Sequence, residues 1–392
     1  MSAGRDYAGV AVAAPVTVPY AKLTPHGAAW FLGRALAATL ETAGLAKDAV
    51  DGLIAASFTL APDTVVALTE HFGIEARHID WLPTGGASGV MALRRAARAV
   101  QCRDAEVVAC IAGDTTDRNR FADLVANFST FSSSAVYPYG AAGPNGVFAL
   151  ITRQYMERHG AAREDFGRLC VTQRYNANRY EHALLRDRPL DLAAYLAARP
   201  VAEPLHLYDC VMPCAGAEGF LVLSEARAAE LGLPYARLLA AVERHNAYRD
   251  DTLFHRGGWR VDRDLLYDSA GVGPDELDCV QLYDDYPVIV FQQLEDLGLC
   301  DPGEAARFVT DRDLRVGLPG LALNTSGGQL SGGQAGAAGG FMGVVEALRQ
   351  VTGQALGNPH PGARRALASG FGMVNFDHCL CSAAAILEGA RP

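Results

Sequence analysis

The sequence predicts an α/β fold made of two similar halves and an insertion. Three observations support this prediction: strand-like and helical segments alternate, one segment pattern occurs twice, and residues 114–205 lack the strand rhythm. Such alternation favours right-handed crossovers and mixed, mostly parallel sheets packed in layers with helices. We expect an N-terminal half at residues 1–113 and 206–232, an inserted loop domain at 114–205, and a C-terminal half at 233–392.

The N-terminal half shows the alternation most clearly. Gly44 follows a run of apolar residues at helical spacing and is suited to end that helix. The pattern predicts a strand, a helix, a strand, a loop with a helix, and a strand, at residues 7–18, 27–44, 53–58, 85–100 and 106–112. The insertion follows, and it contains two predicted helices within residues 151–180, separated at Gly160.

The C-terminal half repeats the N-terminal pattern. An acidic turn before a short strand occurs in both halves, with identities at Ala43/Ala270, Gly44/Gly271, Asp48/Asp275 and Asp51/Asp278. A loop followed by a helix also occurs in both, with identities at Met91/Met342, Ala96/Ala347, Arg98/Arg349 and Val100/Val351. A strand is expected after each copy, the second at residues 363–369. The repeat predicts that both halves share one topology.

Composition limits the classes of function. Of 392 residues, half are hydrophobic, which is ample for a large core, and the formal net charge of −10 argues against binding through nucleic-acid phosphates. The nine cysteines lack metal-ligand spacing and suit reduced, mostly buried thiols, so we expect no metal site. No run approaches the roughly 20 apolar residues of a membrane span, and Pro15 interrupts the apolar start, which is atypical of a signal peptide. We expect a cytoplasmic protein that binds no membrane.

Glycine and other small residues dominate residues 324–340, directly before a helix predicted at 341–351. A glycine-rich loop at a helix N-terminus lets a ligand approach the backbone and directs N–H groups at negative charge. This pattern predicts an anion or oxyanion site. The alternative is a tight loop whose glycines serve only close packing.

This stretch resembles the thiolase superfamily, and within it the sterol-carrier-protein-type branch. The family's loop reads Asn-Pro-x-Gly-Gly, Gly-His-Pro and Gly-Ala-x-Gly, and the chain keeps that frame without a gap at Asn324, Gly327, Gly328, Gly333 and Gly340. The resemblance covers nearly the whole chain. It implies the thiolase fold, an acyl-CoA thioester as substrate, and substrate contacts from Asn324, Gly327 and Gly328.

The inserted loop domain shares this resemblance. Its end matches the family's Pro-Leu-x-x-x-Asp-Cys step at Pro204, Leu205, Asp209 and Cys210. In the family this domain supplies much of the acyl-CoA site.

The family's nucleophilic cysteine is absent. Gly86 stands in its place, and the nearby hydroxyl of Ser88 is either a substitute nucleophile or a structural serine. Backbone N–H groups around Gly86 are still able to bind a thioester oxygen. We therefore predict Gly86 and Ser88 as substrate-binding residues.

Two further family positions have changed. The first is the family's His-Asp-Cys-Phe motif. Tyr283 replaces its histidine, which binds the developing oxyanion, and Asp284 is retained. Asp285 and Tyr286 replace the cysteine and the phenylalanine. A tyrosine O–H donates to an oxyanion or exchanges protons with substrate, although a core tyrosine with a bonded hydroxyl is the alternative. Gln334 replaces the second histidine and keeps an N–H donor without a titrating group. We predict Tyr283 and Gln334 as catalytic residues.

The family's last motif, Cys-x-Gly near the C-terminus, is altered. Depending on the alignment, Ala368 or Phe376 stands at the cysteine. The segment is longer than usual in the family, so Cys379 or His378 could turn back toward the site. We predict Cys379 as a displaced acid or base, with a structural cysteine as the alternative, and Gly372 as a substrate contact.

The residues that stabilise charge on a carbonyl oxygen are thus kept, while the acyl-enzyme cysteine is lost. The resemblance extends to thiolase-like retro-aldolases that act on β-hydroxyacyl-CoA side chains of steroids with a small zinc-ribbon and OB-fold partner. We expect such carbon-carbon bond chemistry, a homodimer through the sheet edge of the first half, and no permanently bound cofactor. The alternatives are an acyltransferase with Cys379 as nucleophile, and a non-catalytic subunit that binds acyl-CoA or a partner protein.

Overall fold

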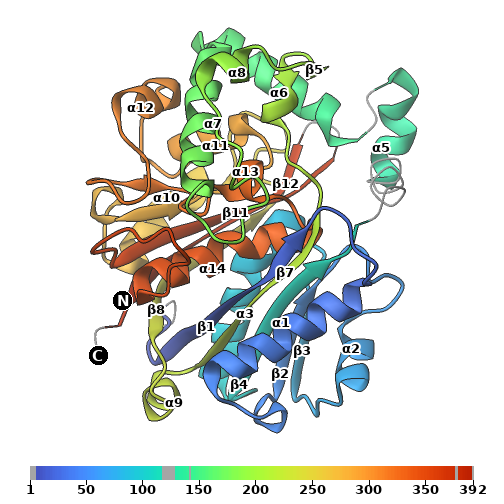
Figure 1. Cartoon of the computed structure of the whole chain (residues 1–392), viewed down its shortest axis with the longest axis vertical. Helices are drawn as coiled ribbons and strands as arrows, with labels where there is room; N and C mark the ends of the chain where they lie inside the picture. Colours follow the sequence, from blue (N-terminus) through green and yellow to red (C-terminus); the bar gives the residue numbers. More distant parts are fainter. Residues whose placement is uncertain (1–5, 117–128, 141–142, 376–377, 391–392) are drawn as a thin grey trace.

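A mixed sheet of ten strands runs through the computed structural model, counted over the described residues 6–116, 129–140, 143–375 and 378–390 (Figure 1). Its order is β10-β9-β11-β12-β8-β1-β7-β4-β2-β3. The strands are β1 (Val10–Ala21), β2 (Gly52–Ala56), β3 (His78–Trp81), β4 (Val107–Asp114), β7 (Ala215–Ser224), β8 (Tyr235–His245), β9 (Cys279–Gln281), β10 (Ala322–Leu323), β11 (Arg365–Asn375) and β12 (His378–Gly389). A separate pair in the insertion consists of β5 (Pro200–Ala202) and β6 (Leu205–His206).

The two halves of the sheet meet at β1. This strand pairs antiparallel with β7 over most of its length and with β8 at residues 11–13. Between the described strands of the sheet, parallel pairing joins β2 with β3 and β4, and β9 with β10 and β11. The mixed sheet was expected, but its antiparallel share is large because β7 and β12 each return alongside the preceding strand of their half.

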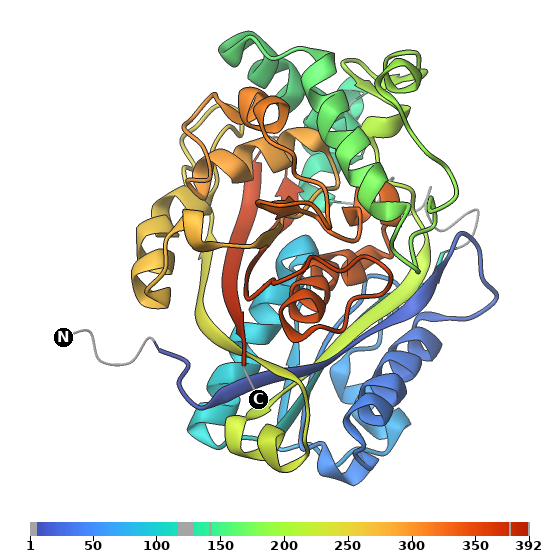
Figure 2. The ribbon, with the colours of Figure 1, turned by 60° about the vertical axis from the view of Figure 1, so that its left-hand side comes forward.

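Helices cover the sheet in layers. Two of them, α3 and α14, contact each other and strands of both halves, so they form an inner layer (Figure 2). The outer faces are covered by α1 on β1 and β4, and by α10 on β8 and β12. The helices are α1 (Ala28–Ala43), α2 (Val65–Phe72), α3 (Ser88–Cys102), α5 (Thr130–Ala135), α6 (Pro144–His159), α7 (Arg163–Ala177), α8 (Leu192–Leu196), α9 (Glu225–Glu230), α10 (Gly258–Ala270), α11 (Pro287–Asp296), α12 (Ala305–Asp311), α13 (Gly328–Gly332) and α14 (Gly339–Thr352).

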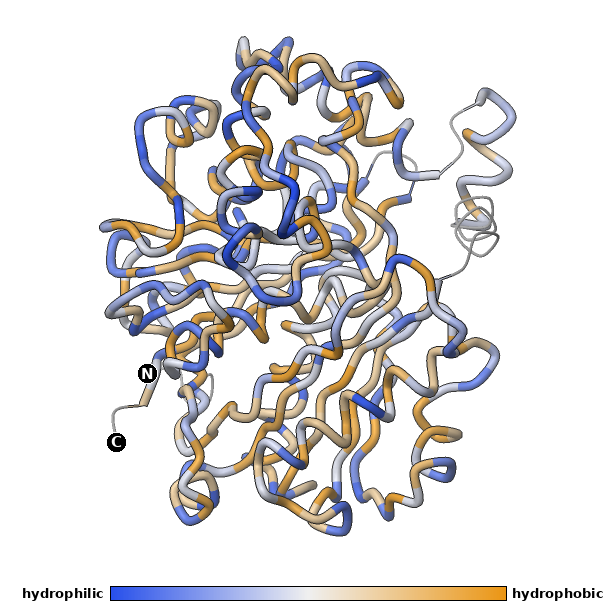
Figure 3. Tube along the Cα trace, in the orientation of Figure 1, coloured by the Kyte–Doolittle hydropathy of each residue, from blue (hydrophilic) through white to orange (hydrophobic). Residues whose placement is uncertain are grey.

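The layered arrangement explains the apolar strands. Every residue of β2 and β4 is buried, because helices or other strands cover both faces. Hydrophobic positions accordingly follow the strands of the lower half, while hydrophilic positions gather at outer turns (Figure 3). None of the helices in the described ranges combines the length and apolar character needed to cross a membrane.

The internal repeat predicted from the sequence is confirmed in three dimensions. Short 3₁₀ turns, at residues 85–87 and 336–338, lead directly into α3 and α14. Asp51 precedes β2, and its carboxylate accepts the N–H groups of Glu106 and Val107 at the start of β4. Asp278 precedes β9, and its carboxylate accepts two N–H groups at the start of β11. The shared aspartate therefore joins neighbouring parallel strands in both halves.

The insertion packs on the C-terminal half. Helix α6 ends at Gly160, whose positive φ of 70° suits glycine, and α7 follows, as predicted. Helix α7 contacts α8, α11, α12 and α13, which ties the insertion to the glycine-rich stretch. The domain boundaries remain a prediction. The nine cysteines are free and six are buried, in agreement with the sequence analysis.

We predict that Asp278→Ala lowers the free energy of unfolding by about 1–3 kcal/mol, because two backbone donors at the start of β11 lose their acceptor. Urea denaturation measures this change. The exposed Asp275 on the same turn is the matched control, and Asp275→Ala should shift stability by no more than about 0.5 kcal/mol. Equal effects of the two substitutions would contradict a structural role of the repeated aspartate.

Candidate active site

A cavity of about 310 Å³ lies where the insertion meets both halves of the sheet. Three residues predicted from the sequence line it together, namely Gly86, Tyr283 and Gln334. They come from the turn before α3, from the end of β9, and from the glycine-rich stretch. The remaining wall is largely apolar and includes Phe148, Leu207, Val211, Phe371 and Val374.

Tyr283 and Gln334 are in direct contact. The Nε2 of Gln334 donates to the phenol oxygen of Tyr283 at 3.3 Å, and the tyrosine is 8% exposed. The Gln334 backbone is fixed because its N–H donates to Met212 and its carbonyl accepts from Cys214. The Phe371 ring lies nearly parallel to the Tyr283 ring, at an angle of 14°. Both polar groups are thus held in place before any ligand binds.

The Tyr283 ring occupies the space next to Gly86. A Cβ atom at position 86 would lie 2.0 Å from Cε2 of Tyr283 and 2.4 Å from the carbonyl oxygen of Phe371. Contacts this short are forbidden, so only glycine fits there. The position that holds the nucleophilic cysteine in thiolases therefore has no room for a side chain.

Asp285 is a site residue that the sequence analysis left out. Its carboxyl group lines the cavity, and its Oδ1 is buried with no hydrogen-bond partner in the described structure. Burial raises the pKa of Asp285 well above its usual value, and the neighbouring charge of Asp284 raises it further. The sequence could have indicated Asp285, because it replaces the cysteine of the family motif that begins at Tyr283.

Tyr283 is a neutral hydrogen-bond donor at physiological pH. Burial raises the pKa of its phenol well above 10, and the charge of Asp285 acts in the same direction. The amides of Gln334 and Gln329 lower that pKa, but they do not offset burial. The cavity therefore offers an O–H and an N–H donor to a developing negative charge.

The glycine-rich stretch binds negative charge as predicted, but the charge belongs to the protein. Asp284 accepts the N–H groups of Gln329 and Leu330 at 2.8 and 3.2 Å, and it also accepts from the side chain of Gln173. Burial raises the pKa of Asp284 to about 7. Asp114 accepts the N–H of Ala337 at 2.7 Å further along the stretch.

Three residues predicted as substrate contacts lie around Asp284 in this arrangement. The Asn324 side chain exchanges hydrogen bonds with the backbone of Leu282, Gly327 packs against Ala177, and a Cβ at Gly328 would lie 2.1 Å from the Asp284 carboxylate. None of the three is among the described residues that line the 310 Å³ cavity. They shape the protein around Asp284 and do not contact the substrate space.

Three other predicted residues also lie away from the cavity. Ser88 is buried and donates to the carbonyl of Leu82, so it is a structural serine. Gly372 lies beneath the turn at residues 85–87, where a Cβ would clash with Cys381. Cys379 belongs to β12, where burial raises its thiol pKa and its Sγ donates to a backbone carbonyl. Cys379 is not among the described residues that line the cavity, and its role as a displaced acid or base stays a prediction.

The alignment alternatives for the last family cysteine supply no reactive group. Ala368 is a fully buried residue of β11, and Phe376 lies outside the described residues. Within the described ranges, Cys210 is the cysteine that lines the cavity. Burial raises the pKa of Cys210 to about 12, so it is a thiol at neutral pH and a poor nucleophile.

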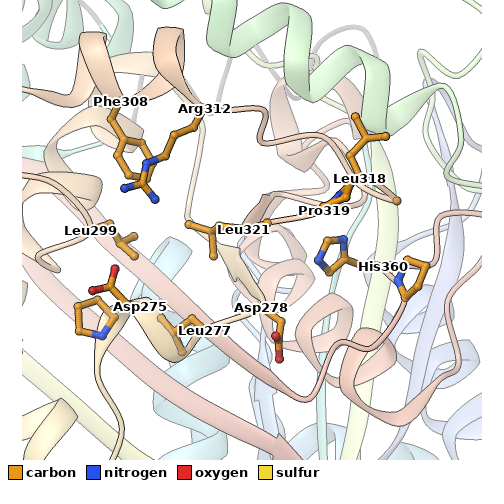
Figure 4. Close-up of a pocket in the computed structure, with 14 residues that line it drawn as sticks. Asp275, Leu277, Asp278, Leu299, Phe308, Arg312, Leu318, Pro319, Leu321 and His360 are labelled. Carbon is orange, nitrogen blue, oxygen red and sulfur yellow. The ribbon is translucent and has the colours of Figure 1, made fainter.

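A larger cavity of about 630 Å³ lies at the opposite end of β9 (Figure 4). Its wall carries Asp275, His360 and Arg312, whose guanidinium lies 4.6 Å from the Phe308 ring centre. It contains none of the predicted site residues. It also opens at the amino ends of the parallel strands, whereas ligands in α/β sheets bind at the carboxyl ends. The smaller cavity is therefore the candidate active site.

Comparison with known proteins agrees with this geometry. The family described as Thiolase C-terminal domain-like matches residues 241–385. A "Steroid side-chain-cleaving aldolase" of Thermomonospora curvata is 32% identical over 83% of this chain and 85% of the relative. The chain belongs to the thiolase superfamily. A "17-hydroxy-3-oxo-4-pregnene-20-carboxyl-CoA lyase" of Mycobacterium tuberculosis is also 32% identical, over 84% and 88% of the two chains.

Two solved structures share the fold of this chain. The "Ltp2-ChsH2(DUF35) aldolase" superimposes with a TM-score of 0.82 at 28% identity, over 97% of this chain and 98% of that one. An SCP2-thiolase-like protein of Mycobacterium smegmatis has a TM-score of 0.71 at 15% identity, over 98% and 78% of the two chains, which shows the common fold.

We predict that Gly86→Ala lowers the free energy of unfolding by about 3 kcal/mol, because the added methyl group clashes with Tyr283 and with backbone. Chemical denaturation measures the change. Gly273→Ala is the matched control, because Gly273 has an ordinary φ of −98° and a Cβ there would lie 3.9 Å from its nearest neighbour, the Glu276 carboxylate. A Gly86→Ala protein as stable as this control would show that the ring does not fill the space.

Proposed function

We propose that this thiolase-superfamily protein is a lyase that cleaves β-hydroxyacyl-CoA thioesters by a retro-aldol reaction, without a covalent acyl-enzyme. One observation carries the proposal: the Tyr283 ring fills the space beside Gly86 that a cysteine nucleophile requires. The phenol therefore replaces the thiol at the site where thiolases react with the thioester.

The retained groups match the needs of a retro-aldol step. Cleavage requires removal of the β-hydroxyl proton and stabilisation of the enolate that forms on the thioester oxygen. Tyr283 and Gln334 supply donors for that oxygen, and one such donor contributes about 3 kcal/mol to transition-state stabilisation. Asp285 supplies a carboxyl group whose raised pKa makes its carboxylate a stronger base for the hydroxyl proton. Asp285 then returns this proton to the enolate carbon, which completes the reaction and regenerates the carboxylate.

The cavity wall suits a bulky apolar acyl group. Aromatic and aliphatic side chains surround the polar groups, as is usual where a few donors orient an apolar ligand. The names of two relatives, a steroid side-chain-cleaving aldolase and a pregnene-carboxyl-CoA lyase, support a polycyclic acyl chain. We include such a chain in the proposal, with coenzyme A as the thiol and no permanently bound cofactor.

We also propose a small partner protein of the zinc-ribbon and OB-fold type. The similar solved structure carries the name "Ltp2-ChsH2(DUF35) aldolase", which pairs Ltp2 with a second component. Activity should therefore be measured with the partner present, and the partner can be obtained by pull-down with this chain as bait.

We also propose a cytoplasmic location, which the free cysteines support.

We predict that Tyr283→Phe slows cleavage of a β-hydroxyacyl-CoA by about 100-fold or more, because the phenol O–H no longer donates to the oxyanion or exchanges its proton. Release of the cleaved acyl-CoA, followed by chromatography, measures the rate. Tyr267 is the matched control, because its half-buried phenol donates to the Leu297 carbonyl away from the cavity. Tyr267→Phe should retain the parent rate.

Two results would overturn the proposal. The first is a Tyr283→Phe protein that cleaves as fast as the parent. The second is the absence of cleavage across a panel of β-hydroxyacyl-CoA esters with the partner bound, which would favour a non-catalytic subunit.

We further propose a homodimer formed through β3, the outermost strand of the N-terminal half. Its unpaired edge is able to pair with a second copy, and Ile79 on this strand is 40% exposed.

We predict that the parent chain sediments at twice its mass of 41.6 kDa and that Ile79→Lys shifts it to monomer in analytical ultracentrifugation. Val261→Lys, at an exposed position of α10, should leave the dimer intact, and a monomeric parent would refute the assignment.

A further inference from the structure

Asn145 places a side-chain amide in the wall of the 310 Å³ cavity. It belongs to the first turn of α6, in the insertion, and lines the cavity together with Phe148 of the same helix. Residues three apart lie on one face of a helix. Both side chains contact Tyr286, which directly precedes α11. The Phe148 ring stacks on the Tyr286 ring with centroids 4.2 Å apart, and Asn145 binds the hydroxyl.

The hydroxyl of Tyr286 determines which end of this amide is free. The tyrosine is 3% exposed, and its pKa is raised well above the usual value by burial and then by the charge of Asp285, so the phenol keeps its proton. Its O–H donates to Oδ1 of Asn145 at 2.6 Å. The opposite amide orientation would leave this buried proton without an acceptor among the described residues. Nδ2 is therefore the end that does not bind Tyr286.

The Nδ2 of Asn145 is an unused donor. It makes no hydrogen bond within the described ranges, and it is not among the buried nitrogen and oxygen atoms that lack a partner, so it is accessible. Solvent satisfies such a donor before a ligand binds. An apolar acyl group that fills the cavity displaces this solvent, and a buried donor without an acceptor costs free energy. A ligand with an oxygen at this place avoids that cost.

We propose that Asn145 is a specificity-determining residue that selects acyl groups with an acceptor oxygen in addition to the thioester carbonyl. Its Nδ2 donates to this oxygen, which is either the β-hydroxyl or a keto or hydroxyl oxygen further along the acyl chain. A fixed donor rejects an analogue that lacks the acceptor, because the donor is then left unpaired. The inference deepens the proposed acyl-CoA lyase function and rests on it.

Tyr286 is a positioning residue in this proposal. Its hydroxyl holds Oδ1 of Asn145 and thereby fixes the direction of Nδ2. Phenylalanine, the family residue at position 286, has no hydroxyl with which to orient the amide. The change from phenylalanine to tyrosine therefore adds an oriented donor to the cavity wall.

Binding of ligands that differ by one oxygen tests the selection. The probes are octanoyl-CoA, 7-oxooctanoyl-CoA and 3-hydroxyoctanoyl-CoA, titrated by isothermal calorimetry. The first two lack a β-hydroxyl and are titrated into the parent chain, whereas the third is compared with octanoyl-CoA in a Tyr283→Phe background that blocks cleavage. We expect Asn145→Leu to lower the preference for at least one oxygenated ligand over octanoyl-CoA by about fivefold, the equivalent of one neutral hydrogen bond.

The ligand that responds identifies the oxygen. A lower preference for 3-hydroxyoctanoyl-CoA assigns the β-hydroxyl, and a lower preference for 7-oxooctanoyl-CoA assigns an oxygen further along the chain. An unchanged preference for both would overturn the proposal, even if all three ligands bound more weakly. The titrations do not depend on cleavage, so they remain informative if the retro-aldol function fails. If none of the three ligands binds the parent, both the acyl-CoA function and the selection are refuted.

Three further variants separate selection from a structural effect. Asn145→Asp keeps the acceptor for Tyr286 but has no N–H, so it should lose any preference for the oxo ligand even if Asn145→Leu fails to fold. Tyr286→Phe should lower the preference less than Asn145→Leu, and it should have no effect on the preference in the Asn145→Leu background. Gln154→Met is the matched control, because Gln154 is a half-buried amide of α6 that does not line the cavity, and it should keep the parent preference.

Discussion

Two buried carboxylates hold the glycine-rich stretch on which the active site depends. Asp284 accepts the N–H groups of Gln329 and Leu330, and Asp114 accepts the N–H of Ala337. Burying a carboxylate is costly unless donors compensate for lost water, and the stretch supplies those donors from its backbone. Gln334 lies between the two anchored points, so its amide is fixed without help from a ligand.

Burial determines the charge state of the phenol in the site. Because burial raises the pKa of Tyr283 well above its usual value, the phenol that faces the substrate space is uncharged near neutral pH. Fixed neutral donors stabilise a charge that appears only in the transition state, and they do not attract an anion beforehand. This property suits an enolate that forms and disappears within one reaction.

Much of the fold and part of the site could be predicted from the sequence. Long segments with clear periodicity, such as α1 and α14, were located within a few residues, while the short edge strand β3 has too few residues to show a period. The motif frame selected Tyr283 and Gln334, which line one cavity, and their catalytic roles stay a prediction. The surroundings of Cys379 could not be predicted, because residue types do not reveal that the pairing of β11 and β12 extends to Asn375 and His378.

The contact between Gly86 and Tyr283 also limits how one reaction type could change into the other. A cysteine introduced at position 86 would occupy the volume of the aromatic ring. Replacing the tyrosine first would leave a protein with neither phenol nor thiol. Because a Cβ at position 86 would also lie 2.4 Å from the Phe371 carbonyl oxygen, engineering a thiolase from this scaffold requires a smaller residue at position 283 and a shift of the β11 backbone together with the cysteine.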